Sequence, residues 1–430
     1  MKTSRRTAVI GGGYAGMAAA MTLSTAGCPV DVYEAGPVLG GRARRIEVDG
    51  LALDNGQHMA IGAYGTLLGL MQEAGVAEAD AFVRLPLELD VLDGPERAMR
   101  LACPRLPAPW HTLLGLLRAK GLSWAERTSA IRTMSLARLQ GWRLKQDCSV
   151  ADWLAQQRQS TKLVRCLWEP LTLAALNTPI ASASAQILLN VLRDSLAADR
   201  AASDFLIPRC DLSAVFPEAA GRYISARGGQ VQCGAMVRHL RRDKHGWQLD
   251  RSEANYEQIV VALPPHRLNM LTLPDGMSLP TLADWHWQPI CTVYLRYPAG
   301  TRLPRPMQGM VGTTAQWLFD RGQLCNQDGL MAAVVSAEGP HQQWEQRRLA
   351  EVVAAEVARS FPALPAPLWQ RVVAEKRATF DCRPGLLRPG NATSLSSLVL
   401  AGDYTAGDYP ATLEGAVRSG VAAAQILLNR

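Results

Sequence analysis

The stretch Thr7-Ala8-Val9-Ile10-Gly11-Gly12-Gly13-Tyr14-Ala15-Gly16 places a short β-branched run before a glycine loop, and an alanine-rich helical pattern follows it. Gly11, Gly13 and Gly16 match the spacing G-x-G-x-x-G. The first glycine allows a tight turn, the second lets the main chain approach a pyrophosphate, and the third lets the helix pack on the strand. Because the N–H groups at the helix start are unpaired, they attract phosphate. The loop, including Gly12 and Ala15, is therefore predicted to bind a dinucleotide.

An acidic residue follows where this fingerprint requires one. Val30–Tyr33 reads as a second strand and ends in Glu34. A carboxylate about 20 residues after the loop accepts hydrogen bonds from the ribose hydroxyls of an adenosine. A glycine turn that binds nothing is the alternative, but strand, loop, helix, strand and acid occur here in order.

A second glycine pair, Gly40 and Gly41, comes shortly after Glu34 and precedes Arg42 and Ala43. A dehydrogenase that binds nicotinamide has no need of it. The glycines let the main chain run beside an extended cofactor, and the Arg42 guanidinium can neutralise a pyrophosphate. Here the chain resembles the two-dinucleotide-binding-domain flavoproteins, the superfamily of amine oxidases and phytoene desaturases. That resemblance implies FAD as the cofactor.

The C-terminal segment is similar to the flavin signature of that superfamily. A buried apolar strand that ends in Gly402 and Asp403 precedes the last, alanine-rich helix. The resemblance implies that Asp403 binds the ribityl chain. It also implies that the helix start, at Thr412, Leu413 and Gly415, points N–H groups at the flavin N1/O2 edge. A helix N-terminus there stabilises the anionic reduced flavin.

A third segment completes the cofactor domain. Residues 231–249 alternate with a period of two and predict hairpin strands, and Gln258–Leu263 reads as a buried strand. The resemblance implies that the Val237 backbone pairs with the adenine. The predicted fold class is α/β: a Rossmann-like FAD-binding domain with an inserted α+β substrate domain that includes a helical subdomain. The expected boundaries are 1–65, 208–266 and 377–430 for the FAD-binding domain, 66–207 for the helical insertion and 267–376 for substrate-domain strands.

Further segments narrow the resemblance. They are Asp54–His58, Trp168–Leu171, Ala175–Thr178, Ala181–Ser182, Arg377–Phe380, Arg383–Gly385 and Pro410–Ala416. Together they are similar to the squalene-associated FAD-dependent desaturases, the hydroxysqualene dehydroxylases of hopanoid biosynthesis, over essentially the whole chain. The resemblance implies conversion of hydroxysqualene, a hydrophobic isoprenoid, to squalene and water with reduced FAD. Gly56 and Gln57 are expected beside the isoalloxazine ring.

The resemblance supplies no catalytic residue, so the candidates come from the chemistry. Loss of water from an allylic alcohol needs a proton donor near the ring. His58 and Asp54 are expected to be the nearest ionisable groups, with Tyr409 and Asp408 facing them from the C-terminal loop. For His58 there is an equal alternative: a buried imidazole hydrogen-bonded to a main-chain carbonyl.

Residues 110–145 combine helical amphipathic spacing with tryptophans and positive charge. The apolar positions include Trp110, Leu113, Leu114, Leu116, Leu117, Trp124, Ile131, Met134, Leu139 and Trp142. The basic positions are Arg118, Lys120, Arg127, Arg132, Arg138, Arg143 and Lys145, and Glu126 is the only acid before Asp147. This composition is typical of a helix in an anionic membrane interface. A helical substrate domain with a buried apolar face and solvated arginines has the same pattern, so both interpretations stay open.

Composition excludes several other classes of protein. Among 430 residues 48% are hydrophobic, which is globular, and the net charge of +7 is too diffuse to predict nucleic-acid binding. No run reaches the ~18 apolar residues of a membrane-spanning helix. Nine scattered cysteines without a CxxC pair predict neither a disulfide framework nor a metal site, and favour a reducing compartment, the cytoplasm, with peripheral contact at the inner membrane face. Arg5-Arg6 resembles a twin-arginine export signal, but the glycine spacing that follows favours a first strand.

Three functions remain open at this stage. They are a squalene-forming reductive dehydroxylase, a polyene desaturase or amine oxidase on the same scaffold, and a non-catalytic flavin-binding lipid carrier. An amine oxidase typically has an aromatic cage beside the flavin, whereas aromatic residues are only 6% of this chain. The electron donor is not identified, because only one dinucleotide fingerprint is present.

Overall fold

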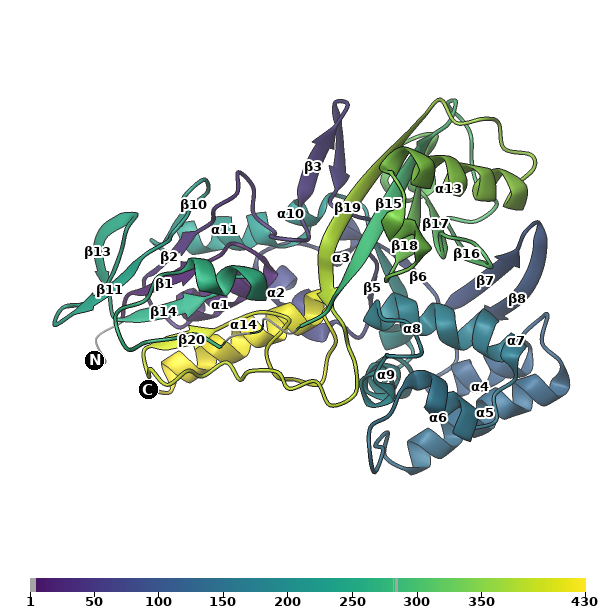
Figure 1. The fold of residues 1–430 in the computed structure, drawn as a ribbon, viewed down its shortest axis with the longest axis horizontal. Coiled ribbons are helices and arrows are strands. Elements are labelled where there is room, and N and C mark those ends of the chain that lie inside the picture. Colours follow the sequence, from purple (N-terminus) through teal and green to yellow (C-terminus); the bar gives the residue numbers. More distant parts are fainter. Residues whose placement is uncertain (1–4, 281, 283–284) are drawn as a thin grey trace.

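The computed structural model describes residues 5–280, 282 and 285–430 (Figure 1). The glycine loop lies at the carboxyl end of the central strand of a five-stranded sheet. The strand order is β10-β2-β1-β14-β20, and all pairings are parallel. The strands are β1 (Thr7–Ile10), β2 (Val30–Tyr33), β10 (Gln230–Gln232), β14 (Gln258–Val261) and β20 (Leu398–Leu400).

Both faces of this sheet are covered, which explains why its strands read as continuous apolar runs. Val9 and Val260 pack among the helices on one face. Ile10 and Val261 belong to the core on the other face, together with Trp247 of a small antiparallel sheet. The helices are α1 (Tyr14–Thr25), α2 (Gly65–Glu73), α3 (Glu78–Ala81), α10 (Leu212–Val215), α11 (Pro217–Ser225) and α14 (Leu413–Leu428).

The prediction of hairpin strands over 231–249 is correct only for its second half. The antiparallel sheet consists of β11 (Leu240–Asp243), β12 (Gly246–Leu249) and β13 (Ser252–Tyr256). β10 instead pairs in parallel with β2. Gly229 makes this possible, since a Cβ there would meet the Val30 carbonyl oxygen. Such close approach between distant segments cannot be detected from a two-residue period.

A second large sheet has seven strands in the order β19-β15-β18-β17-β16-β7-β8. Its strands are β7 (Glu88–Asp93), β8 (Glu96–Ala102), β15 (Trp287–Arg296), β16 (Met307–Val311), β17 (Trp317–Asp320), β18 (Leu330–Ser336) and β19 (Trp369–Phe380). The helices α12 (Arg321–Cys325) and α13 (Gln346–Ser360) and a 3₁₀ turn (Pro340–Gln343) lie beside them. β19 and β15 are long strands that reach toward the part of the molecule that contains the five-stranded sheet (Figure 1).

The expectation of a helical insertion over 66–207 is wrong for its first part. β7 and β8 belong to the seven-stranded sheet, and β7 pairs in parallel with β16, where Val91 lies opposite Gly309. A partner so far along the chain leaves no local signal. The domain boundaries themselves stay predictions.

Two smaller β elements connect the sheets. They are the hairpin β3 (Arg45–Val48) and β4 (Leu51–Asp54), and the sheet of β5 (Ala60–Ile61), β9 (Phe205–Pro208) and β6 (Phe82–Leu85). A 3₁₀ turn (Pro265–Met270) follows β14.

The remaining helices gather at the end of the molecule opposite the chain termini, beside β7 and β8 (Figure 1). They are α4 (Trp110–Leu117), α5 (Trp124–Leu139), α6 (Val150–Gln156), α7 (Thr161–Leu163), α8 (Glu169–Leu176) and α9 (Ala185–Leu192), with π-helical turns (Val164–Trp168, Arg193–Ala197) and a 3₁₀ turn (Ala201–Ser203). A capping box of Ser123 and Glu126 starts α5. Within the described part of the chain, no helix combines the length and apolarity that crossing a bilayer demands.

Candidate functional site

The loop between β1 and α1 has the geometry that its glycines predict. Gly11 has φ +110°, and a side chain at Gly16 would collide with the Gly11 carbonyl oxygen. Gly13 is the N-cap of α1, and no side chain caps that helix. The N–H groups of its first turn are therefore available to a phosphate.

The Glu34 carboxylate is held beside this loop. One of its oxygens accepts a hydrogen bond from Gly12 N at 2.7 Å, and the other accepts from Gly36 N at 2.6 Å. These bonds fix the carboxylate at the end of β2, where remaining lone pairs can accept further bonds. Its expected contact with a ribose stays a prediction.

Arg42 and Asp403 were expected to contact different parts of the cofactor, and here they contact each other. The Arg42 guanidinium lies 2.5 Å from an Asp403 carboxylate oxygen and also donates to the Ala378 carbonyl at 2.8 Å. The ion pair joins the first and last segments of the cofactor domain. Their separate roles at the pyrophosphate and the ribityl chain stay predictions.

A cleft of about 610 Å³ connects these elements. All the predicted cofactor residues line it except Gly12, Gly16 and Gly415. Those that do are Gly11, Gly13, Ala15, Glu34, Gly40, Gly41, Arg42, Ala43, Gly56, Gln57, Val237, Gly402, Asp403, Thr412 and Leu413. Gly415 instead donates its N–H to the Thr412 hydroxyl, which caps α14. The structure thus brings together residues that lie up to 402 positions apart in sequence, from Gly11 to Leu413.

The donor groups of the cleft fit FAD. The uncapped start of α1 suits the phosphates. Three residues of the wall carry a buried polar atom that no group in the described chain satisfies: His266 Nδ1, Trp317 Nε1 and the Tyr404 hydroxyl. Buried polar atoms normally have a partner, and an extended cofactor with phosphates, hydroxyls and ring carbonyls offers many acceptors.

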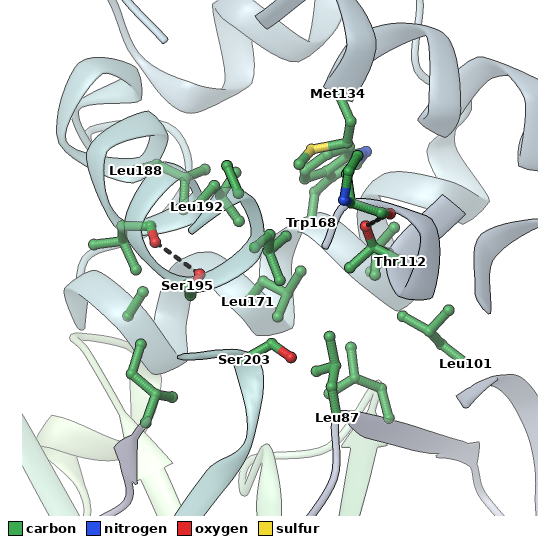
Figure 2. Close-up of a pocket in the computed structure, with 18 of the residues that line it drawn as sticks. Leu87, Leu101, Thr112, Met134, Trp168, Leu171, Leu188, Leu192, Ser195 and Ser203 are labelled. Atoms are coloured by element: carbon green, nitrogen blue, oxygen red, sulfur yellow. Dashed lines mark hydrogen bonds between the residues drawn. The ribbon is translucent and has the colours of Figure 1, made fainter. Parts of the chain in front are cut away.

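A second cavity, of about 230 Å³, is lined almost entirely by hydrocarbon. Figure 2 shows its leucines, Met134 and Trp168 facing a common space. The hydroxyls of Thr112, Ser195 and Ser203 donate to main-chain carbonyls of their own helical turns, so they add little polarity. The one charged residue of the wall, Arg138, is exposed. A long apolar molecule is the ligand that such a wall suits.

The two cavities share part of their walls. The residues that line both are Met59, Tyr64, Ala174, Ala175 and Thr412. An apolar ligand in the smaller cavity would therefore meet the end of the cofactor cleft. Tyr64, directly before α2, was not singled out from the sequence, because no motif surrounds it.

His58 has the geometry of the alternative interpretation. Its Nδ1 lies 2.8 Å from the Gly56 carbonyl oxygen, so Nδ1 carries the proton and Nε2 is left as an acceptor. Burial and, to a lesser degree, the nearby positive charge of Arg42 lower the pKa of His58. A neutral imidazole arranged in this way is a poor proton donor at pH 7. His58 lines the cofactor cleft and not the apolar cavity.

Asp54 was expected near the ring, but the structure does not place it in the wall of the cofactor cleft. It is 1% exposed and lines neither cavity. One carboxylate oxygen accepts from Leu212 N at 2.8 Å. Burial raises the pKa of Asp54 to about 7. The sequence could not show that the end of β4 turns toward α10.

Tyr409 lines the apolar cavity and belongs to a polar cluster behind the cavity wall. Its hydroxyl donates to Asp194 at 2.6 Å, and the Arg418 guanidinium lies over its ring at 4.2 Å. Burial, reinforced by Asp194, raises the pKa of Tyr409. Asp408 is exposed, and its expected position facing the ring stays a prediction. Asp194 was missed, since it comes from a distant π-helical turn.

Comparison with known proteins adds to this geometry. A family model described as flavin containing amine oxidoreductase matches residues 14–428. The chain is 31% identical to hydroxysqualene dehydroxylase of Rhodopseudomonas palustris, with 99% of each chain covered. It is 29% identical to hydroxysqualene dehydroxylase of Sinorhizobium fredii, with 98% of each covered. An oxidoreductase from Methanosarcina mazei has a similar structure, with a TM-score of 0.75 at 17% identity over 98% of this chain and 99% of that one.

Proposed function

Because the chain belongs to the flavin containing amine oxidoreductase family and is an FAD-dependent oxidoreductase, we propose that it reduces hydroxysqualene to squalene and water. The relatives that bear the name hydroxysqualene dehydroxylase match it over nearly their full length. This activity would place the enzyme on the route to squalene and hopanoids.

One observation carries the proposal: a hydrocarbon-lined cavity shares a wall with the cofactor cleft. Reduced FAD, when bound, supplies a hydride to the carbon that loses its oxygen. The chain's own residues hold the isoprenoid and exclude water. Leu87, Leu101, Leu171, Leu188 and Leu192 surround the space (Figure 2). A cation formed on loss of water would be short-lived in contact with solvent, so exclusion of water matters.

A polyene desaturase also needs an apolar cavity, whereas an amine oxidase needs polar groups that receive an amine. The wall of this cavity carries no carboxylate, and Tyr409 is its only aromatic residue from the C-terminal loop. The composition of the wall therefore favours a hydrocarbon chain. The direction of electron flow separates a dehydroxylase from a desaturase.

Anaerobic titration of the chemically reduced holoenzyme tests the proposal. Hydroxysqualene is expected to reoxidise the flavin, followed by its absorbance, and to yield one squalene per flavin by mass spectrometry. Squalene, phytoene and a primary amine serve as controls and should leave the flavin reduced. If phytoene instead reduced the flavin of the oxidised enzyme, the result would support a polyene desaturase. If the amine reduced it, the result would support an amine oxidase. A flavin that no substrate reoxidises or reduces would support a lipid carrier.

We also propose that α4 and α5 rest on an anionic membrane surface, at its cytoplasmic face. Trp110, Trp124 and Leu139 are 60%, 65% and 82% exposed. Among the large apolar side chains that the structure describes as exposed, five of eight lie between residues 106 and 139. The inner faces of the same helices line the apolar cavity through Leu113 and Met134. A substrate dissolved in the bilayer would thus have a short path to the cavity.

The charge of this surface complements an anionic bilayer. No ion pair within the described residues involves its basic side chains, which are Arg118, Lys120, Arg127, Arg132, Arg138, Arg143 and Lys145. Tryptophan and leucine beside arginine and lysine that form no ion pair are typical of interfacial helices.

Co-sedimentation with phosphatidylglycerol vesicles at low salt tests this contact. The wild type is expected to bind, and the double variant Trp110→Ser/Trp124→Ser to bind much less. Leu387→Ser is the matched control, since Leu387 is 89% exposed but lies far from α4 and α5 in sequence. Wild-type protein that stays in the supernatant would rule out the membrane contact.

A further inference from the structure

The wall shared by the two cavities contains two hydroxyl groups in an otherwise apolar setting. Tyr64 and Thr412 line both the cofactor cleft and the hydrocarbon cavity, together with Met59, Ala174 and Ala175. A substrate carbon that exchanges a hydride with the cofactor must lie at this junction. Whatever oxygen that carbon carries must then lie there as well.

Four other hydroxyls of the apolar cavity already donate hydrogen bonds to acceptors within the protein. Thr112 donates to the Pro109 carbonyl at 2.8 Å, Ser195 to Val191 at 2.7 Å, and Ser203 to Arg200 at 2.7 Å. The hydroxyl of Tyr409 donates to Asp194 at 2.6 Å. Ser135 also lines the cavity, and it is exposed on α5.

Tyr64 differs from these residues. The nearby Thr412 hydroxyl donates to the Pro410 carbonyl at 3.3 Å, so its proton is not available to the Tyr64 oxygen. Thr412 itself is held in place because its oxygen accepts from Gly415 N at 3.0 Å at the start of α14. Of the two hydroxyls in the shared wall, Tyr64 is therefore the one whose proton a ligand can receive.

We propose that Tyr64 is the binding site for the hydroxyl group of the substrate: its phenol donates a hydrogen bond to the carbinol oxygen. The proposal rests on the function proposed above. It names the Tyr64 phenol as the group by which the enzyme distinguishes hydroxysqualene from squalene. Squalene has no oxygen to accept this bond, so the product is bound less tightly than the substrate and leaves the junction. The departing water takes the same bond.

The protonation state of Tyr64 suits this role. Burial, and after it the negative charge of Glu414, raises the pKa of the phenol. Glu414 is fully buried, where its carboxylate accepts from Thr66 N and Leu67 N at the start of α2. Tyr64 therefore stays protonated, and donates, throughout the neutral range of pH.

The test measures binding to the oxidised holoenzyme, which cannot reduce the substrate. Hydroxysqualene and squalene, each in detergent micelles, are titrated while the flavin absorbance is followed. Wild type is expected to bind hydroxysqualene more tightly than squalene. Tyr64→Phe is expected to lose about ten- to hundredfold in affinity for hydroxysqualene, the usual range for one buried hydrogen bond, with affinity for squalene unchanged. Tyr223→Phe, the matched control on α11 outside both cavities, should keep the wild-type preference.

The outcomes separate this inference from the proposed function. Wild type that shows no preference for the alcohol, and whose reduced flavin hydroxysqualene does not reoxidise, contradicts the proposed substrate. A preference that wild type and Tyr64→Phe share, at equal FAD content, overturns the role of Tyr64 alone. Should Tyr64→Phe not retain FAD, Tyr64→Gln is measured instead. Glutamine keeps an N–H donor, so this variant is expected to retain part of the preference for hydroxysqualene. Complete loss of that preference in Tyr64→Gln would overturn the role of Tyr64 as a hydrogen-bond donor.

Discussion

The Asp54 carboxyl is a buried acid whose pKa lies far from its ordinary value. Burial disfavours its ionised form more than the bond from Leu212 N favours it, and its pKa rises to about 7. Between pH ~4 and 7 the folded protein therefore holds a proton that the unfolded chain releases. Its contribution to the free energy of unfolding is fully present below pH ~4 and is lost as the pH rises to 7.

Asp54→Asn should remove this dependence, since asparagine keeps the shape and has no charge to bury. We expect the thermal midpoint of wild type to fall between pH 5 and 8 and that of the variant to fall less. At pH 8 the variant should be more stable, by at most about 4 kcal/mol. Calorimetric scans at both pH values measure this, with Asp275→Asn as a control at the surface. Parallel pH profiles for wild type and Asp54→Asn would contradict it.

Asn177 belongs to Ala175–Thr178, one of the segments that narrow the family resemblance, and its contacts show what this residue does in the fold. It ends α8 in the left-handed conformation, with φ 47°. Its side-chain amide donates to Thr379 Oγ1 at 3.0 Å and accepts from Ala337 N at 2.7 Å. The residue thus joins the helical part to two strands of the seven-stranded sheet. The segment around Asn177 therefore stabilises the contact between two parts of the fold.

At the scale of elements, the loop after β20 depends on one half-buried arginine. Arg388 donates to the main-chain carbonyls of Asp403 at 2.6 Å, Tyr409 at 2.7 Å and Gly407 at 3.1 Å. Burial lowers its pKa, and the negative charge of Asp403 counters part of that effect. The loop carries both Asp403 in the cofactor cleft and Tyr409 in the apolar cavity.

Arg388→Met should therefore loosen the loop, because methionine keeps the apolar stem and offers no donor. We expect destabilisation of about 2–4 kcal/mol from the carbonyls left unpaired, and a lower FAD content after purification. Chemical denaturation and the ratio of flavin to protein absorbance measure the two effects. Arg359→Met, on the exposed side of α13, is the control. Full FAD content in Arg388→Met would show that the loop does not need this arginine.

At the scale of the whole molecule, the cofactor cleft joins parts that the chain keeps apart. Its wall includes Gly13 of the first segment, Val237 of the middle segment and Asp403 of the last, together with Ile290 and Trp317 of the seven-stranded sheet. A ligand that contacts all of them couples their unfolding, and it stabilises the folded state by mass action.

Removal of FAD is thus expected to lower the thermal midpoint, and added FAD to restore it. A hundredfold excess over the dissociation constant contributes ~2.7 kcal/mol. Riboflavin, which lacks the phosphates and the adenosine, should restore less, because it reaches neither the start of α1 nor Glu34. Differential scanning calorimetry at graded ligand concentrations measures this. Equal stabilisation by riboflavin would contradict an extended cofactor across the cleft.

Short patterns of neighbouring residues in the sequence were enough to predict residues that line the cofactor cleft. The loop from Gly11 to Gly16, the acid Glu34 and the strand before Asp403 each act through neighbours in sequence, so their spacing already implies their geometry. Only the tertiary structure decided that Asp54 is buried beside α10, outside the walls of both cavities. It also decided that β7 and β8 join the second sheet and that Tyr64 lies at the junction of the two cavities. Such features arise where side chains from distant segments pack together, and packing depends on shape and distance in space, which spacing along a chain does not record.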